Sequence, residues 1–319
     1  MDDTKRVSIL INPRSFRMSI HGRLERVEAL ARQHDIELCR VSGPCDIEPA
    51  IASALRDEAR LIVIIGGDGT LQAAVTALAK FDSAKKLPGI LMLAGGRTNY
   101  TARDLGSHDQ LVDTLRLAIE TPELLQTTTR NSLKVSQANQ PDCHGFFIAG
   151  ALVDHVIREC HSYRAGGTGP LRQGHLSSAW RVLQLGLLAL IGRHSFRAPS
   201  LDIDAGELGR VSGPTRLLLL TSLHHRSELV DPYADRGSGP VRLTAIRRGA
   251  PGFWRRLHRM LCGRYHAAMS PEQGYLSGCT DEVRIRGLAQ LCLDGQELNL
   301  DPLEELVIRA GPAFRFLHP

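Results

Sequence analysis

The sequence predicts a doubly wound α/β domain followed by an antiparallel β domain, and three observations lead to this prediction. Up to about residue 125, continuously apolar segments alternate with segments of helical spacing. Beyond that point the apolar segments become shorter, and turn-rich pieces such as 233–240 separate them. A glycine-rich turn joins the third apolar segment to the next helical pattern, in "LIVIIGGDGTLQ" (61–72). At 319 residues the chain is long enough for two domains.

The first domain is expected to span residues 1–125. Four apolar segments predict its strands, at 7–12, 36–41, 61–65 and 89–93. Helical spacing follows each strand, near residues 24–31, 46–59, 70–81 and 108–120. Strands that are apolar throughout and separated by helices indicate a parallel sheet covered on both faces. This is the doubly wound arrangement.

Six shorter segments predict the strands of the second domain, at 132–137, 145–153, 215–223, 241–247, 282–287 and 289–295. Two helices are expected to interrupt them, at about 176–192 and near 252–263. The alternation and the turns between the segments favour antiparallel pairing.

Composition and charge are those of an ordinary globular protein with a mild basic excess. The net charge of +5 and pI of about 8.9 favour anionic partners such as phosphates or acidic lipid headgroups, and we expect no nucleic-acid partner. The longest apolar region, from Trp180, is shorter than a membrane span. Seven cysteines without metal-ligand spacing favour reduced thiols, so we expect a cytoplasmic protein.

The glycine-rich turn predicts a phosphate site. A helix N-terminus attracts anions, and Gly66, Gly67 and Gly69 would let the backbone approach one closely. Thr70 is expected to cap the helix and to donate its hydroxyl to phosphate. Asp68 would repel a bare phosphate, so it indicates a divalent metal, or an oriented water or ribose. The alternative is a tight strand-to-helix turn with Asp68 as a local cap, but motif and context together favour a ligand.

The turn "GGDGT" resembles the motif of the diacylglycerol kinase catalytic family, which includes sphingosine kinases and bacterial lipid kinases; NAD kinases share it. Three further segments are similar to the lipid side of this group. "LINPRS" (10–15) resembles the first-strand N-P-x-(S/A/G) motif, and "GILMLAGGRTNYTARDLG" (89–106) resembles P-x-G-T-x-N-D-F-A-R-x-L-G. "LDGQEL" (293–298) resembles the late D-G-E motif. The segments occur in the family's order, nearly end to end.

The resemblance implies a nucleotide-binding α/β domain followed by a β-sandwich-like domain at 126–299, with residues 300–319 returning to the first domain. It implies ATP between the domains, Mg²⁺ near Asp68, and Asp294 as the carboxylate that accepts or orients the proton of a lipid hydroxyl. Without the resemblance, Asp294 would be interpreted as a β-turn aspartate. The implied nucleotide-binding residues are Asn12, Gly66, Gly67, Gly69, Thr70, Gly96, Arg97, Thr98, Asn99 and Arg103.

The sequence departs from the family pattern at several of these motifs. The departures are Phe16, Gln72, Ala73, Arg97, Tyr100 and Gln296. Arg97 can pair with a phosphate. Tyr100 and Gln296 each replace an acid, which would weaken a metal site.

Outside these motifs, the predicted helix near 252–263 is the most basic stretch. Phe253, Trp254, Leu257, Met260 and Leu261 are expected to share one face. Such a helix suits an anionic membrane interface, and equally a basic helix packed on the β domain. A second glycine-rich stretch, 163–175, is expected to form a loop over the lipid site.

These features together predict an ATP-dependent lipid kinase, cytoplasmic and peripherally associated with the membrane. It would phosphorylate a hydroxyl of a diacylglycerol- or sphingoid-like lipid. Two alternatives remain open: an NAD-kinase-like enzyme, although the later Asn-Glu pair of such enzymes has no evident counterpart, and a catalytically weakened nucleotide- or lipid-binding protein. A homodimer is left open as well.

Overall fold

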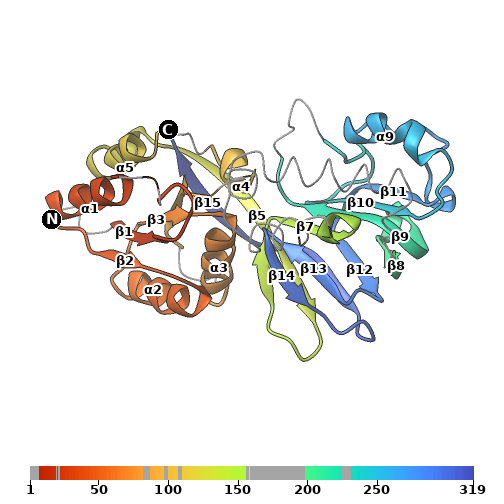
Figure 1. Ribbon diagram of the computed structural model, residues 1–319, viewed down its shortest axis with the longest axis horizontal. Coiled ribbons are helices and arrows are strands. Elements are labelled where there is room, and N and C mark those ends of the chain that lie inside the picture. Colours follow the sequence, from red (N-terminus) through yellow and green to blue (C-terminus); the bar gives the residue numbers. More distant parts are fainter. Residues whose placement is uncertain are drawn as a thin grey trace.

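The computed structural model describes residues 7–18, 20, 22–81, 87–96, 100–106, 110–155, 158, 198–224 and 231–319. The predicted helix at 176–192, the stretch 163–175 and the residues Arg97, Thr98 and Asn99 lie outside this part, as do the side chains of Tyr100 and Arg103. An α/β part and a β-rich part lie next to each other along the long axis of the molecule (Figure 1). The predicted fold class is confirmed.

The α/β part is built on a parallel sheet. Its strands are β1 (Val7–Ile11), β2 (Leu38–Arg40), β3 (Leu61–Gly66) and β4 (Gly89–Ala94), in the order β2-β1-β3-β4. Helices α1 (Arg23–Gln33) and α5 (Leu111–Glu120) cover one face, and α2 (Pro44–Arg56) and α3 (Asp68–Ala79) cover the other (Figure 1). Alternate residues of β3 enter the two clusters, with Ile62 on the α2/α3 side and Val63 on the α1/α5 side. Both faces of the strand are therefore apolar.

The β-rich part is a sandwich around one apolar cluster. One sheet contains β5 (Gln126–Gln137), β6 (Cys143–Gly145), β8 (Ser200–Asp204), β12 (Glu282–Arg286) and β15 (Leu306–His318). The other contains β7 (Phe147–Ala151), β10 (Val241–Arg247), β11 (Tyr275–Thr280), β13 (Gln290–Leu293) and β14 (Gln296–Asn299). The long strand β9 (Arg210–Thr221) belongs to both, because it pairs with β8 up to Pro214 and with β7 and β10 beyond it.

Short helices complete the described part. They are α4 (Tyr100–Asp104), α9 (Phe253–Leu261), and the 3-10 turns at Pro122–Leu124, Gly206–Leu208 and Pro271–Gln273. Of the helices within the described residues, none is both long and apolar enough to span a bilayer.

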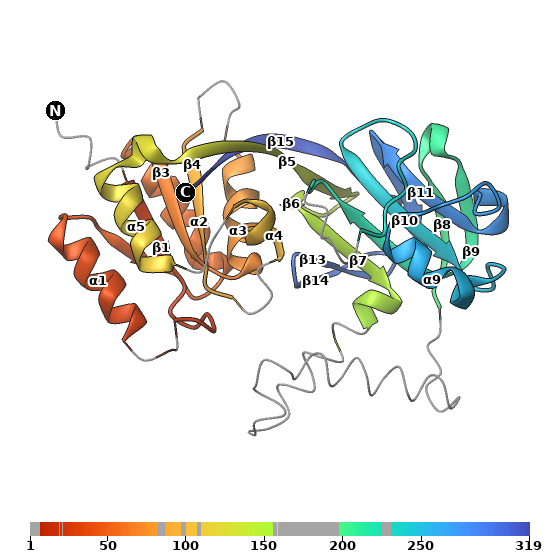
Figure 2. The same cartoon turned by 90° about the horizontal axis from the view of Figure 1, so that it is seen from above.

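Strand β15 belongs to both parts of the molecule. Near its C-terminal end Phe316 pairs in parallel with Ile90 of β4, and near its start Ile308 pairs with Val283 of β12. Along its length β15 pairs antiparallel with β5, and the two strands run together from one part to the other (Figure 2).

Two strand predictions between residues 126 and 153 need correction, and the strand predicted at 215–223 runs from Arg210 to Thr221 instead. The segment 132–137 is the end of a longer strand that begins at Gln126, because the polar stretch 127–131 pairs with β15 while lying partly exposed. The single strand predicted at 145–153 is divided into β6 and β7, with Phe146 at the bend between them. Apolar pattern alone did not reveal either feature.

Phe316 provides a stability test of the strand that joins the two parts. Its ring is fully buried and packs edge to face on Phe146, with ring centroids 5.6 Å apart. Phe316→Ala should lower the free energy of unfolding by about 3–5 kcal/mol, because it leaves a cavity in the core. Urea denaturation measures this. As a control, Leu303→Ala changes a side chain that is 90% exposed and should shift stability by less than about 0.5 kcal/mol.

Candidate functional site

The strand order creates a crevice at the carboxyl ends of β1 and β3. In the strand order β2-β1-β3-β4, the chain leaves β1 toward β2 on one side and leaves β3 toward β4 on the other side. Ligands of open α/β sheets bind where neighbouring strands diverge in this way. Asn12 directly follows β1, and its N–H donates to the carbonyl oxygen of Ile65 at 2.8 Å. Its Nδ2 donates to Oγ1 of Thr70 at 3.3 Å. Residues from two of the sequence motifs therefore meet at this crevice.

The glycine turn begins α3 without a side-chain cap. Gly67 is the N-cap, in an extended conformation (φ −95°), and Asp68 opens the first helical turn. Thr70 was expected to cap the helix, and this is wrong: it lies inside the first turn, where it accepts the hydrogen bond from Asn12. The first amides of a helix have no acceptor within it, so a glycine cap leaves them accessible to an anion.

The glycine turn at this crevice packs against Thr70 and against the turn that follows β4. A Cβ on Gly66 would lie 2.7 Å from Oγ1 of Thr70, and one on Gly67 would lie 3.5 Å from Cα of Gly96. Gly95 donates its N–H to the carbonyl oxygen of Gly66 at 2.7 Å. The turn after β4 thus lies directly against the turn after β3. The predicted Gly96 is at the site, and Gly95 is a member that the sequence analysis missed.

Three hydrogen-bond donors hold Asp294 at the turn between β13 and β14. Its side chain is only 5% exposed. The N–H groups of Phe146 and Phe147 donate to its two carboxylate oxygens at 2.8 and 2.9 Å. The Thr101 hydroxyl of α4 donates to Oδ1 at 3.4 Å. An aspartate that served only the β-turn would be exposed, whereas this carboxylate is buried between the two parts of the molecule.

Burial and a neighbouring charge raise the pKa of Asp294 to about 8. Burial is the larger cause, and the negative charge of Asp68 is the second; the donors Phe146, Phe147 and Thr101 act in the opposite direction. Asp68 of the α/β part and Asp294 of the β-rich part therefore share one site. A proton or a cation between them would relieve their repulsion.

The donor set fits a magnesium ion shared with a substrate. Throughout the described ranges, no group of three or more His, Cys, Asp or Glu side chains could hold a metal by itself. Mg²⁺ commonly binds through one or two carboxylates together with substrate phosphates. Asp68 lies at the start of α3, and its charge acts on Asp294. These carboxylates could therefore provide the protein ligands of an Mg²⁺ ion whose other ligands are substrate phosphates.

Two departures from the family pattern have structural roles. Gln72 is buried, and its Nε2 donates to the carbonyl oxygen of His144 and to Oγ1 of Thr76, both at 3.0 Å, which ties α3 to β6. Gln296 lies over the first turn of α3. Its Nε2 is so close to Gly69 that a Cβ at that position would collide with it. Phe16 and Ala73 are half-buried.

Further site residues were missed by the sequence analysis. The donors to Asp294 are backbone groups or a buried hydroxyl, for which no sequence pattern exists. Apart from these contacts, Asp154 is a further buried acid; it pairs with Arg158 at 2.9 Å, and burial raises its pKa. Its place just after the apolar segment 145–153 was the available signal. His144 has a structural role, because its backbone N–H donates to Oγ1 of Thr76 at 2.9 Å and its Nδ1 lies 3.1 Å from Oγ of Ser132.

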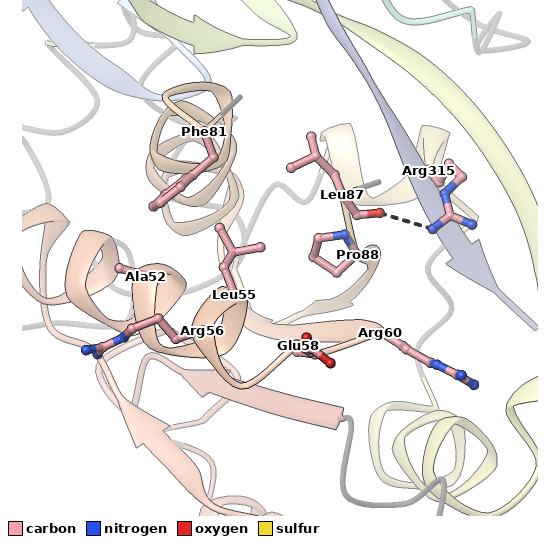
Figure 3. Close-up of a pocket in the computed structure, with 10 residues that line it drawn as sticks. Ala52, Leu55, Arg56, Glu58, Arg60, Phe81, Leu87, Pro88 and Arg315 are labelled. Atoms are coloured by element: carbon pink, nitrogen blue, oxygen red, sulfur yellow. Dashed lines mark hydrogen bonds between the residues drawn. The ribbon is translucent and has the colours of Figure 1, made fainter. Parts of the chain in front are cut away.

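A surface pocket of about 920 Å³ lies at the other end of the parallel sheet (Figure 3). Arg60 and Pro88, just before β3 and β4, line it, together with Leu55 of α2. Arg315 donates to the carbonyl oxygen of Leu87 at 3.1 Å, as Figure 3 shows. The pocket is therefore separate from the crevice at the carboxyl ends of the strands.

The fold and the site define an α/β domain joined to a β-sandwich. The α/β domain has a glycine-rich turn at its crevice that is suited to an anion, and the sandwich contributes the buried carboxylate of Asp294. Residues 6–128 match the family model of the diacylglycerol kinase catalytic domain. The chain is similar in fold to a crystal structure of a candidate diacylglycerol kinase from Bacillus anthracis str. Sterne, with a TM-score of 0.66, 14% identity, and coverage of 99% of this chain and 97% of that one. A crystal structure described as a diacylglycerol kinase from the same organism has a TM-score of 0.61 and 12% identity, with the same coverage.

A search of the curated proteins finds no match. At these identities the structural likeness shows the fold alone, over nearly the whole length of both chains. The resemblance to the diacylglycerol kinase catalytic domain family is confirmed for residues 6–128.

The raised pKa of Asp294 makes stability depend on pH. The pKa is about 8 in the folded protein and about 3.9 in an unfolded chain, so between these values the folded state binds the extra proton. The free energy of unfolding should fall as pH rises from about 4 to about 8, by up to about 1.4 kcal/mol per pH unit from this group. Asp294→Asn should remove this contribution in metal-free protein, measured by urea denaturation at a series of pH values. Asp235→Asn, at an exposed aspartate, should leave the slope unchanged.

Gly145 tests the packing around the buried carboxylate. A Cβ there would lie 2.5 Å from Oδ2 of Asp294 and 2.6 Å from Cδ1 of Leu293, both buried. Gly145→Ala should therefore destabilise the protein by about 1–3 kcal/mol through overpacking. Leu303→Ala, at a residue that is 90% exposed, is the control. Equal stability of the two variants in urea would contradict the packing described for Asp294.

Proposed function

We propose that the protein is an ATP-dependent lipid kinase, which transfers the γ-phosphoryl group of ATP to a hydroxyl of a diacylglycerol- or sphingoid-like lipid. The observation on which this rests is the position of Asp294, a buried carboxylate with a raised pKa that is coupled to Asp68 at the start of α3. Phosphoryl transfer requires positioned groups and charge neutralisation more than covalent chemistry. This arrangement is suited to both.

The glycine turn and its neighbours would bind the phosphates. Gly66, Gly67 and Gly96 provide close backbone approach, and the accessible amides of the first turn of α3, which includes Gly69, would donate to phosphate oxygens. Asn12 donates a hydrogen bond to the Thr70 hydroxyl oxygen beside this turn. Asp68 would hold Mg²⁺, which when bound would screen the phosphate charge. Arg97, Thr98, Asn99 and Arg103 are proposed members of the same site on the family resemblance.

Asp294 is proposed as the general base. In its ionised form it would accept the proton of the lipid hydroxyl, while the N–H groups of Phe146 and Phe147 hold both oxygens in place. A base works best when its pKa lies near the working pH, and a pKa of about 8 meets that condition.

The domain match favours a lipid over NAD as the acceptor, because residues 6–128 match the diacylglycerol kinase catalytic domain. A lipid acceptor also requires contact with a membrane, so we propose a cytoplasmic enzyme that binds the membrane peripherally. The competing candidate is a protein that binds nucleotide without turnover. The side chain of Gln296, which lies over Gly69 where phosphate would bind, favours that candidate.

The test is transfer of radiolabel from ATP, with Mg²⁺, to a panel of diacylglycerols, sphingoid bases and NAD. Label in an extracted lipid is the expected result. Label in NADP alone would assign the NAD-kinase-like activity, and nucleotide binding without any product would assign the binding protein.

Two substitutions test the proposed roles of the acids. Asp294→Asn should lower turnover by about 10²–10⁴-fold, the usual contribution of a general base, and should leave ATP binding in place. Asp68→Asn should lower turnover and weaken the Mg²⁺ dependence of ATP binding, measured by calorimetry. Asp235→Asn is the matched control. Full turnover in either site variant would remove that residue from the proposed mechanism.

A further inference from the structure

The segment from Arg236 to Pro271 has an unusual charge composition. It contains eight arginines and neither aspartate nor glutamate. Helix α9 lies within it and packs on the β-rich part, toward the end of the molecule away from the N-terminus (Figure 1). Such a long arginine-rich stretch without a carboxylate gives this end of the molecule a local positive charge.

One face of α9 anchors the helix to the sandwich. Phe253 and Met260 are buried, and Leu257 packs beside them against a cluster that includes Ile246 and Tyr275. Trp254 and Leu261, predicted on the same face, lie outside this buried cluster and are exposed, which corrects the prediction. The helix is therefore fixed in place by one set of apolar residues while another set remains outside.

The outward side of α9 combines apolar and basic residues. Trp254 is 65% exposed and Leu261 is 37% exposed. They are seven residues apart, or two helical turns, so they lie on the same side of the helix. The exposed Arg255, His258 and Arg259 border them. An exposed tryptophan beside arginines is an arrangement suited to a bilayer interface.

Strand β9 adds a further cation to this surface. The Arg216 guanidinium lies 4.5 Å from the ring centroid of Phe253 and 5.4 Å from that of Trp254. Burial and then the charge of Arg248 lower the pKa of Arg216, so like charges gather here. Arg242 is paired with Asp231 at 2.7 Å. By contrast, Arg216, Arg248, Arg255 and Arg259 form ion pairs with no carboxylate among the residues that the structure describes.

We propose that this surface, made of Arg216, Arg248, Trp254, Arg255, Arg259 and Leu261 and here called the α9 surface, docks the protein on anionic phospholipid bilayers. Trp254 and Leu261 would enter the interface, and the arginines would contact the lipid phosphates. The proposal rests on the proposed function, since a lipid kinase must reach an acceptor in a bilayer. A second copy of the chain is a poor occupant, because it would place the same positive charges against each other.

The experiment measures binding without ATP. The full chain is sedimented with vesicles of phosphatidylglycerol and phosphatidylcholine, and with vesicles of phosphatidylcholine alone. We expect binding only to the anionic vesicles, and weaker binding as salt is raised. Trp180→Phe leaves Trp254 as the single tryptophan, and its emission should shift to the blue on binding.

Matched variants separate charge from apolar insertion. Arg255→Gln with Arg259→Gln should weaken vesicle binding about 30-fold, since each arginine near an anionic surface contributes on the order of 1 kcal/mol. Arg26→Gln with Arg116→Gln makes the same charge change on α1 and α5 and should have little effect. Trp254→Ala should also weaken binding, whereas Leu303→Ala, at another exposed apolar residue, should not.

Several results would overturn the proposal. These are equal binding to neutral vesicles, unchanged binding in the α9 variants, and retention of an acidic protein or a nucleic acid in place of vesicles. A dimer weakened by Trp254→Ala, without vesicle binding, would assign the surface to a second copy. Turnover on lipid dispersed in detergent is measured separately and should be unchanged in the α9 variants. Vesicle binding without turnover would count against the kinase proposal alone.

Discussion

The pairing of β5 with β15 is the interaction on which the rest of the structure depends. Each strand begins in one part of the molecule and ends in the other, and together they continue the parallel sheet into the sandwich. Phe316 packs in the core of the α/β part, and Ile308 packs in the core of the sandwich. Because both ends of β15 are anchored in this way, Asp68 and Asp294 can form one site although they belong to different parts.

A second connection supports the first. Gln72 and Thr76 of α3 bond to the backbone of His144, and the residues that follow are Gly145, Phe146 and Phe147. This short segment therefore contacts the helix that begins at the glycine turn and also presents two N–H groups to Asp294. A substitution in this segment would alter the position of the Asp294 carboxylate relative to the glycine turn at the start of α3.

The site concentrates negative charge at its centre, whereas the α9 surface concentrates positive charge on the β-rich part. Burying Asp294 near Asp68 is electrostatically costly, and its raised pKa is the measure of that cost. Gln296 removes one acid from this crowded position compared with the family pattern. In the proposed function, the central charge serves phosphoryl transfer and the outer charge serves contact with the membrane that contains the acceptor.

The sequence by itself determined the fold class and the glycine turn, because apolar periodicity and glycine placement are local properties of the chain. Tertiary structure alone decided that Asp294 is buried, that Gly67 meets Gly96, that Gln72 binds β6, and that Trp254 points outward. Each of these depends on elements distant in sequence that come together only in the folded protein. Segment pattern also could not show that β5 extends through the polar residues 127–131, since that stretch is held by its pairing with β15 rather than by burial of apolar side chains of its own.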